Sequence, residues 1–277
     1  MTEEKNDIAQ ATDHNTQRKL SIQAGLNGLS FCVTDPIDHR IIAFERVGLQ
    51  PGATPYTLLK ELKARLNGAD LRGKGFSEVL VVHKNNMFSL VPKALFHRDE
   101  MANYLKFNAK IMANDLLAYD EIPNQELVNV YIPYTNINNY IFELFGEFEF
   151  KHSGTVMITA LLGQGRAPVD PVCYLQVSAN EMEMMVVADK KLRFYNQFEY
   201  TGKEDFLYYL LFSLEQLGLS PETIPVKMFG SIEEGDPTFE LCHRYVGHLS
   251  VFVPNSPLLP LEELEDGALD FSILSAL

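Results

Sequence analysis

The chain contains an internal repeat, and this repeat constrains its fold more than any other feature. The segment "LSIQAGLNGLSFCV" near the start recurs in pattern as "YLQVSANEMEMMVV" in the second half, which aligns Gln23 with Gln176 and Asn27 with Asn180. In both copies, apolar residues keep the two-residue alternation of half-buried strands. Duplication of this kind predicts two similarly built domains packed side by side.

The elements that follow the aligned strands keep the same order in both halves. Each copy continues with a third strand ("RIIAFERV" and "LRFYNQFEY"), a long helix, a short apolar strand and a second helix that contains "FEL". The first copy holds roughly fifty extra residues before its second helix, which indicates an inserted subdomain at about residues 85–126. After this insert we expect "LVNVYIP" to be a strand of the first domain that leads into the helix "INNYIFELFG".

The repeat predicts the domain organisation. Residues 1–18 are polar and lack periodicity, which is typical of a flexible tail. We expect a first domain at 19–168 and a second domain with an acidic C-terminal segment at 169–277, joined at the Gly- and Pro-rich "LLGQGRAPVDP". Three antiparallel strands followed by alternating helices and strands describe the ribonuclease-H-like unit, so the fold class is α/β with mixed sheets.

This layout resembles the actin-like ATPase superfamily, and within it the pilus-assembly and division-type members that carry an insert in the first domain. The stretch "FSLVPKALFHRDEMANYLKFN" resembles the opening of that insert. More closely, the chain resembles an uncharacterised bacterial family assigned to this fold, for which "KLSIQAGLNGLSFCVTD" and "LVPKALF" are typical. The resemblance covers nearly the whole chain after residue 18 and rests on hydrophobic patterns.

The resemblance implies that ATP and magnesium bind between the domains, next to an Asp-x-Gly turn after the first strand of each. The carboxylates orient the ion, and the glycine lets backbone amides approach phosphate. Here the matching positions read Gln23-Ala24-Gly25 and Gln176-Val177-Ser178. Both carboxylates are replaced by carboxamides, and Glu181 would direct a negative charge toward phosphates. The adenosine-contacting stretch would fall at "VKMFGSIEEGD", where Gly230 and Ser231 fit the pattern.

These departures predict an actin-like binding or scaffolding protein that has lost nucleotide hydrolysis, with no catalytic residue, no metal and no cofactor. An atypical ATP-binding protein that holds phosphates with Gly25, Asn27, Gly28 and Ser178 is the first alternative, and a small-molecule kinase relative, which would need a catalytic Asp near the cleft, is the second. The two glutamines either bond to neighbouring strand ends or bind an uncharged, peptide-like ligand. The residues expected at the inter-domain cleft are Gln23, Gly25, Asn27, Gly28, Gln176, Ser178, Asn180, Gly230 and Ser231.

Charge and cysteine usage bear on partners and location. A formal net charge of −14 disfavours nucleic acid as a partner. The basic residues near the first long helix (Lys60, Lys63, Arg65, Arg72 and Lys74) are interrupted by Glu61 and Asp70, as on a solvated helix face. The cysteines Cys32, Cys173 and Cys242 lie far apart in apolar segments, so we expect reduced core thiols and a cytoplasmic location. No segment is long and apolar enough for a signal peptide or a membrane span.

Two further features bear on partners and metals. The ending "PLLPLEELEDGALDFSILSAL" mixes Leu, Ile and Phe with acidic residues, a pattern typical of segments that dock onto a protein partner or onto their own domain, with self-docking as the default. A protein partner is therefore expected, although the sequence does not identify it. His243 and His248 are five residues apart and would lie on different faces of a helix, which disfavours zinc.

Overall fold

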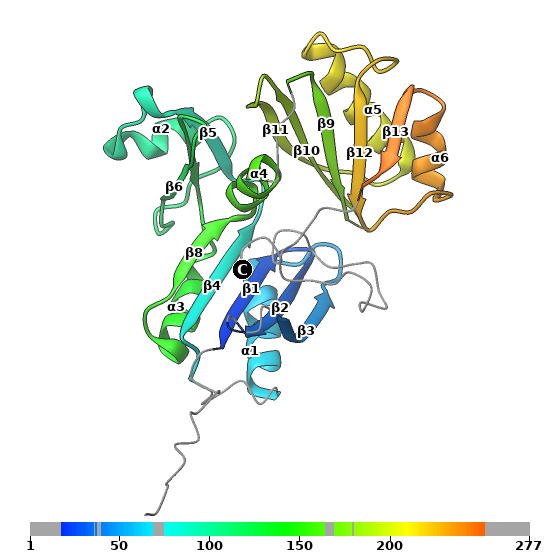
Figure 1. Ribbon diagram of the computed structural model, residues 1–277. Helices are drawn as coiled ribbons and strands as arrows, with labels where there is room; N and C mark the ends of the chain where they lie inside the picture. Colours follow the sequence, from blue (N-terminus) through cyan, green and yellow to red (C-terminus); the bar gives the residue numbers. More distant parts are fainter. Residues whose placement is uncertain are drawn as a thin grey trace, which may run out of the picture.

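The computed structural model describes residues 18–35, 37, 40–68, 75–163, 169–178 and 180–252. Most of the predicted tail, part of the predicted hinge (164–168) and the C-terminal segment from residue 253 lie outside these ranges. Figure 1 shows two large sheets, one in each half of the chain, with a smaller sheet beside them.

The first sheet is mixed, as the sequence predicts. β1 pairs antiparallel with β2 and parallel with β4, while β3 and β8 form the two edges. Its strands, in spatial order, are β3 (Arg40–Gly48), β2 (Gly28–Asp35), β1 (Lys19–Gly25), β4 (Glu78–Lys84) and β8 (Glu149–His152).

The second sheet repeats this arrangement strand for strand. In spatial order it contains β11 (Lys191–Glu199), β10 (Glu181–Ala188), β9 (Val172–Val177), β12 (Pro225–Gly230) and β13 (His248–Val251), with the same parallel and antiparallel pairings. Even an irregularity is shared, because the register shifts between Val33 and Thr34 in β2 and between Val186 and Val187 in β10. The predicted duplication is confirmed, while the domain boundaries at residues 18 and 168 stay predictions.

Helices cover one face of each sheet, where alternate strand residues are apolar. Leu20, Ile22 and Ala24 of β1 pack against α1 (Pro55–Gly68) and α3 (Thr135–Phe145). In the second half, the corresponding side chains of β9 and β10 pack against α5 (Lys203–Gln216) and α6 (Pro237–His243). This burial of one strand face supplies each domain with its own hydrophobic core.

The inserted subdomain is larger than the sequence predicts. It forms a three-stranded antiparallel sheet in the order β5 (Phe88–Pro92), β7 (Leu127–Tyr131), β6 (Ala118–Ile122). The strand expected to belong to the first domain, "LVNVYIP", is therefore the central strand of the inserted sheet. The sequence pattern misled because an apolar run before a helix does not reveal which strands it pairs with. Three short helical turns complete the insert: η2 (Lys93–Leu95), η3 (Arg98–Glu100) and α2 (Met101–Leu105).

Helix α4 (Ser153–Gly163) lies between the insert and the second sheet (Figure 1). Its residues Met157, Ile158 and Leu161 share one apolar cluster with Phe88 of the insert and with Tyr174 of β9. Gly154 lies against the Tyr195 ring so closely that an added Cβ would be 2.6 Å from Cε1 of that ring. This cluster therefore joins the insert to the second sheet through α4.

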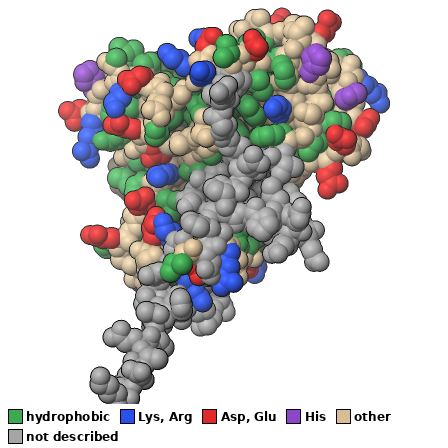
Figure 2. All heavy atoms as spheres, in the orientation of Figure 1, with side chains coloured by type: hydrophobic (Ala, Val, Ile, Leu, Met, Phe, Trp, Pro, Cys, Tyr) green, Lys and Arg blue, Asp and Glu red, His purple; other side chains and the backbone are tan. Residues whose placement is uncertain are grey.

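The cysteines and the charged residues can be compared with the predictions made from composition. The three cysteines are free and buried, as expected of core thiols. On α1, Arg65 pairs with Glu61 and Glu45, as on a solvated helix face, while Arg72 and Lys74 lie outside the described residues. On the face drawn in Figure 2, acidic and basic side chains are interspersed over the described surface. No helix in the described part of the chain is long and apolar enough to cross a bilayer.

Candidate functional site

A cavity of about 580 Å³ lies where the first turns of the two domains meet. Six of the nine predicted cleft residues line it: Gln23, Gly25, Asn27, Gly28, Ser178 and Asn180. The other three, Gln176, Gly230 and Ser231, are not among its lining residues. Gln176 is buried, and Ser231 donates its backbone N–H to the carbonyl of Val177 at 2.8 Å. The two equivalent glutamines thus have different surroundings, since only Gln23 reaches the cavity.

The equivalent asparagines of the two repeats meet directly. The Nδ2 group of Asn180 donates to Oδ1 of Asn27 at 3.2 Å, and Nδ2 of Asn27 donates to Oε2 of Glu181 at 3.0 Å. Both residues belong to the turns that follow the first strand of each domain. The positions at which a phosphate-binding turn would present backbone amides are therefore bridged by side-chain hydrogen bonds between the domains.

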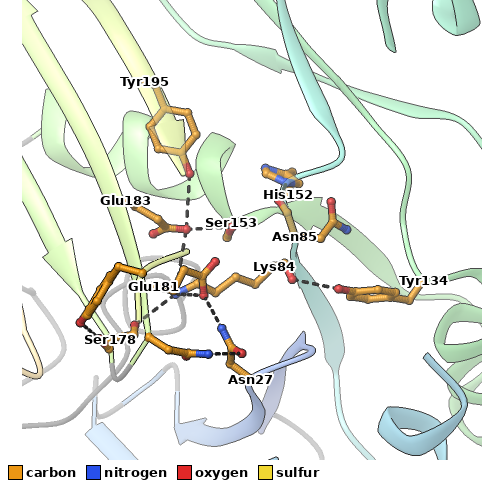
Figure 3. Close-up of polar contacts among 12 residues, drawn as sticks. Asn27, Lys84, Asn85, Tyr134, His152, Ser153, Ser178, Glu181, Glu183 and Tyr195 are labelled. Carbon is orange, nitrogen blue, oxygen red and sulfur yellow. Dashed lines mark hydrogen bonds and ion pairs between the residues drawn. The ribbon is translucent and has the colours of Figure 1, made fainter. Parts of the chain in front are cut away.

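Lys84, at the end of β4, adds a charged contact between the domains. Figure 3 shows its side chain extending toward β10. The Nζ atom lies 3.7 Å from Glu181 Oε2, 4.0 Å from Glu183 Oε1 and 3.4 Å from Ser178 Oγ. Lys84 is only 7% exposed, so its charge is withdrawn from water. Such a buried cation requires the two carboxylates as counter-charges.

Glu183 is fixed by donors from both halves of the chain. Ser153 Oγ, at the start of α4, donates to Glu183 Oε1 at 3.3 Å, and the Tyr195 hydroxyl donates to the same atom at 3.4 Å. Burial, together with the carboxylates of Glu183 and Glu181, raises the pKa of Tyr195 well above its ordinary value. Tyr195 therefore stays protonated and acts as a hydrogen-bond donor at neutral pH. We name the set Asn27, Lys84, Ser178, Asn180, Glu181 and Glu183 the inter-domain clamp.

Two buried histidines hold the strand end that carries Lys84. His83 Nδ1 accepts from the Tyr134 N–H at 3.2 Å, while its Nε2 lies 2.8 Å from Asn138 Oδ1 and donates to it. His152 Nδ1 accepts from the Gly154 N–H at 3.0 Å, and its Nε2 donates to the Asn85 carbonyl at 2.9 Å. Each ring makes one donor and one acceptor contact, which is the pattern of a neutral imidazole. Burial lowers the pKa of His83 to about 3 and that of His152 to about 4.

These histidines predict a loss of stability in mild acid. Their unfolded pKa is about 6.5, so below that value the unfolded chain takes up protons that the folded chain refuses. Stability is complete above pH 6.5 and is lost as pH falls toward the folded pKa values. We expect the free energy of unfolding, measured in urea, to drop by on the order of 1 kcal/mol between pH 7 and pH 6.

The measurement is limited to pH 6 and above because Asp120 has the opposite effect on stability in stronger acid. Asp120 accepts a hydrogen bond from the backbone N–H of His152, and burial raises its pKa, so protonation of Asp120 favours the folded state. A His152→Gln variant should show a shallower pH dependence than the wild type. Equal free energies of unfolding at pH 7 and pH 6 would contradict the neutral, buried state of the two rings.

The cavity and its surroundings offer little catalytic chemistry. Both nitrogens of His83 and His152 are engaged, so neither ring is placed to act as a base. Within the described ranges, no group of three or more His, Cys, Asp or Glu side chains is arranged to hold a metal ion. His243 and His248, which the sequence disfavours as ligands, are both exposed.

Lys84 and Glu183 were not predicted as site residues. A signal existed for Glu183, because "EMEMMVV" places two glutamates on the same strand face as Met185 and Val187, within an otherwise apolar run. Lys84 directly follows the apolar run "VLVVH" at the carboxyl end of a parallel strand, an edge where ligand-binding groups gather.

The two sheets of shared strand order, with a cavity between their first turns, define an actin-like ATPase fold. A Bacteroides thetaiotaomicron protein with this fold and unknown function matches with a TM-score of 0.77 and 18% identity, over 86% of this chain and 91% of that chain. The PilM–PilN type IV pilus biogenesis complex matches with a TM-score of 0.61 and 14% identity, over 92% of this chain and 96% of that chain. At these identities the matches show the fold alone.

The chain belongs to the DUF3822 family of proteins of unknown function, whose model matches residues 7–249. No curated protein matches it significantly. The predicted resemblance to an uncharacterised family with an actin-like fold is therefore confirmed.

Proposed function

We propose that the protein is a non-catalytic binding or scaffolding module, built on the actin-like fold, whose inter-domain cavity does not take magnesium-ATP. The observation that carries this proposal is the inter-domain clamp. Lys84, a buried cation that lines the cavity, is held by Glu181, Glu183 and Ser178 of the other domain.

The charges around the cavity support the proposal. The cavity is lined by two basic residues, Arg46 and Lys84, and by two acidic residues, Glu181 and Glu199. A triphosphate carries several negative charges, and its binding needs an excess of donors and cations. Here the two signs are equal in number, so the lining offers no net attraction to a polyanion.

The residues also do not fit a magnesium ion. Magnesium in nucleotide sites is held by one or two carboxylates together with phosphate oxygens and waters. The positions expected to supply those carboxylates are Gln23 and Gln176. Glu181, which lines the cavity together with Glu199, and the buried Glu183 bond to Asn27, Lys84, Ser153 and Tyr195. An ion that used Glu181 or Glu183 as a ligand would have to break these contacts.

A role in binding another protein is consistent with a complex formed by a protein of the same fold. PilM, which shares the fold, occurs in a complex with PilN in type IV pilus biogenesis. We infer that this chain also acts through a protein partner. The free, buried cysteines suit a reducing compartment such as the cytoplasm.

Calorimetric titration with ATP and magnesium tests the proposal. We expect no binding at micromolar nucleotide, both for the wild type and for a Gly28→Ala variant whose first turn is perturbed. Micromolar binding by the wild type that Gly28→Ala weakens would favour the alternative of an atypical nucleotide-binding protein.

A further inference from the structure

One wall of the inter-domain cavity contains a row of three glycines. The strand register places Gly28 of β2 opposite both Gly25 of β1 and Gly48 of β3, and all three line the cavity. At Gly48 an added Cβ would meet nothing within 4 Å, and its φ lies outside the left-handed region. Packing therefore does not require a glycine at position 48. A bare strand at this place allows a ligand to approach the backbone of the sheet.

A polar row lies next to the glycines on the same face of the first sheet. Ser30 is in register with Gln23 of β1 and with Arg46 of β3, and these three residues also line the cavity. Gln23 and Arg46 each have a contact of their own. Ser30 is only 3% exposed, and its hydroxyl makes no hydrogen bond to any residue in the described ranges. A buried hydroxyl that lines a cavity is a hydrogen-bonding site for a ligand.

The second domain contributes an uncharged acceptor from the equivalent row. Gln197 of β11 occupies the position that Arg46 has in the first sheet, and it also lines the cavity. Its Oε1 atom is buried and accepts no hydrogen bond within the described part of the chain. A carboxylate or phosphate would offer this oxygen no donor, and the balanced charge of the lining attracts no polyion. Ser30 and Gln197 together favour a neutral ligand that carries both donors and acceptors.

Aliphatic side chains supply the apolar part of the lining. Leu26, in the turn between β1 and β2, is 37% exposed, and Leu49, Pro51 and Met87 also line the cavity. Tyr134 is the one aromatic side chain among the described lining residues, and it is only 4% exposed. A sugar ring therefore has no open aromatic face to stack on, whereas an aliphatic side chain of a peptide can bury its surface against these residues.

We propose that the inter-domain cavity binds a short, uncharged peptide segment with aliphatic side chains, supplied by the protein partner. Peptide N–H and C=O groups offer the donors and acceptors that Ser30 and Gln197 lack, and the glycine row admits a peptide backbone. The volume of about 580 Å³ lies within the range of about 300–1,000 Å³ typical of sites that enclose a small ligand, so only a few residues enter. The inference rests on the proposed function, because it names the part of the partner that the cavity recognises.

Selection from a library of random seven-residue peptides on the full-length protein tests the proposal. The enriched peptides should carry aliphatic side chains and no charged ones. Their affinity, measured by fluorescence anisotropy, should fall at least tenfold for Gly48→Val, which fills the cavity, and for Ser30→Ala, which removes the hydroxyl. The matched controls are Gly75→Val, at a glycine with equally open surroundings, and Ser213→Ala, at another buried serine. Neither control residue lines the cavity, so both variants should bind like the wild type.

Three results would overturn the proposal: no enrichment of any peptide, enrichment of charged peptides, or equal binding by the wild type and both cavity variants. Urea unfolding establishes that the variants are folded, and Ser30→Ala decides alone where Gly48→Val is not. A neutral oligosaccharide such as maltotriose serves as a second probe. Its binding by the wild type, abolished in Gly48→Val, would show that the ligand is a sugar and would likewise overturn the proposal.

Titration with ATP and magnesium separates this inference from the proposed function. Micromolar ATP binding by the wild type that Gly48→Val abolishes would defeat the proposed function. Absence of both ATP and peptide binding would defeat only the assignment of a peptide to the cavity.

Discussion

Replacing Lys84 with methionine is expected to lower the free energy of unfolding by about 3–5 kcal/mol, because it leaves two buried carboxylates without their cation. Glu181 and Glu183 are both nearly inaccessible to water, so solvent cannot take over the role of the ammonium group. Methionine keeps most of the length and apolar volume of the lysine stem, which confines the change to the charge. Urea unfolding at pH 7 measures the effect.

Two comparisons make the Lys84 prediction specific. Lys93 pairs with Glu121, but both side chains are about half exposed, so Lys93→Met should lower the free energy of unfolding far less than Lys84→Met does. Adding Glu181→Gln and Glu183→Gln to Lys84→Met should recover part of the loss, since the uncompensated charges are then gone. Equal losses for Lys84→Met and Lys93→Met would show that the clamp contributes no more than a surface ion pair.

Gly230→Ala is the second substitution with a large expected effect. Gly230 has a φ of +94°, and an added Cβ would lie 2.4 Å from the backbone carbonyl oxygen of Val177. Because that oxygen belongs to β9 and also accepts from the Ser231 N–H, it cannot move away without disturbing the sheet. We expect a loss of about 3–5 kcal/mol, from backbone strain and overpacking together.

Gly235 offers a matched control for Gly230. Its φ is +95°, but an added Cβ would meet nothing within 4 Å. Gly235→Ala should therefore cost only the conformational part, about 1–2 kcal/mol. The difference between the two variants, measured by the same urea unfolding, isolates the contact with Val177. Equal losses would mean that close packing at Gly230 contributes nothing.

The contact at Gly230 also illustrates an ambiguity of glycine patterns in a sequence. The pattern around Gly230 and Ser231 resembles a nucleotide-contacting turn, and a glycine there satisfies two requirements equally well. It allows a ligand to approach the backbone, and it allows one strand to approach another. Sequence alone does not distinguish these two requirements. In the structure, Gly230 allows close approach of its strand to β9. The same holds for Gly28, where a Cβ would lie 2.5 Å from the Val47 carbonyl oxygen.

The fold was more predictable than the site for a physical reason. Strand alternation in "LSIQAGLNGLSFCV" and its repeat reflects burial of one sheet face, which each strand records in its own residues. The same order of elements in both halves then identified the ribonuclease-H-like unit. The pairing of β7 with β5 and β6, by contrast, depends on segments far apart in the chain. The inter-domain clamp depends on how the two domains pack. In the sequence, Lys84 and Glu183 are recognisable only as charged residues beside or within apolar runs.

The apolar cluster around α4 has a mechanical consequence. Since Met157, Ile158 and Leu161 are shared by the insert and by the second sheet, swinging one lobe away from the other would expose hydrocarbon on both. A force that separates the insert from the second sheet would therefore act on α4, whose apolar side chains contact both.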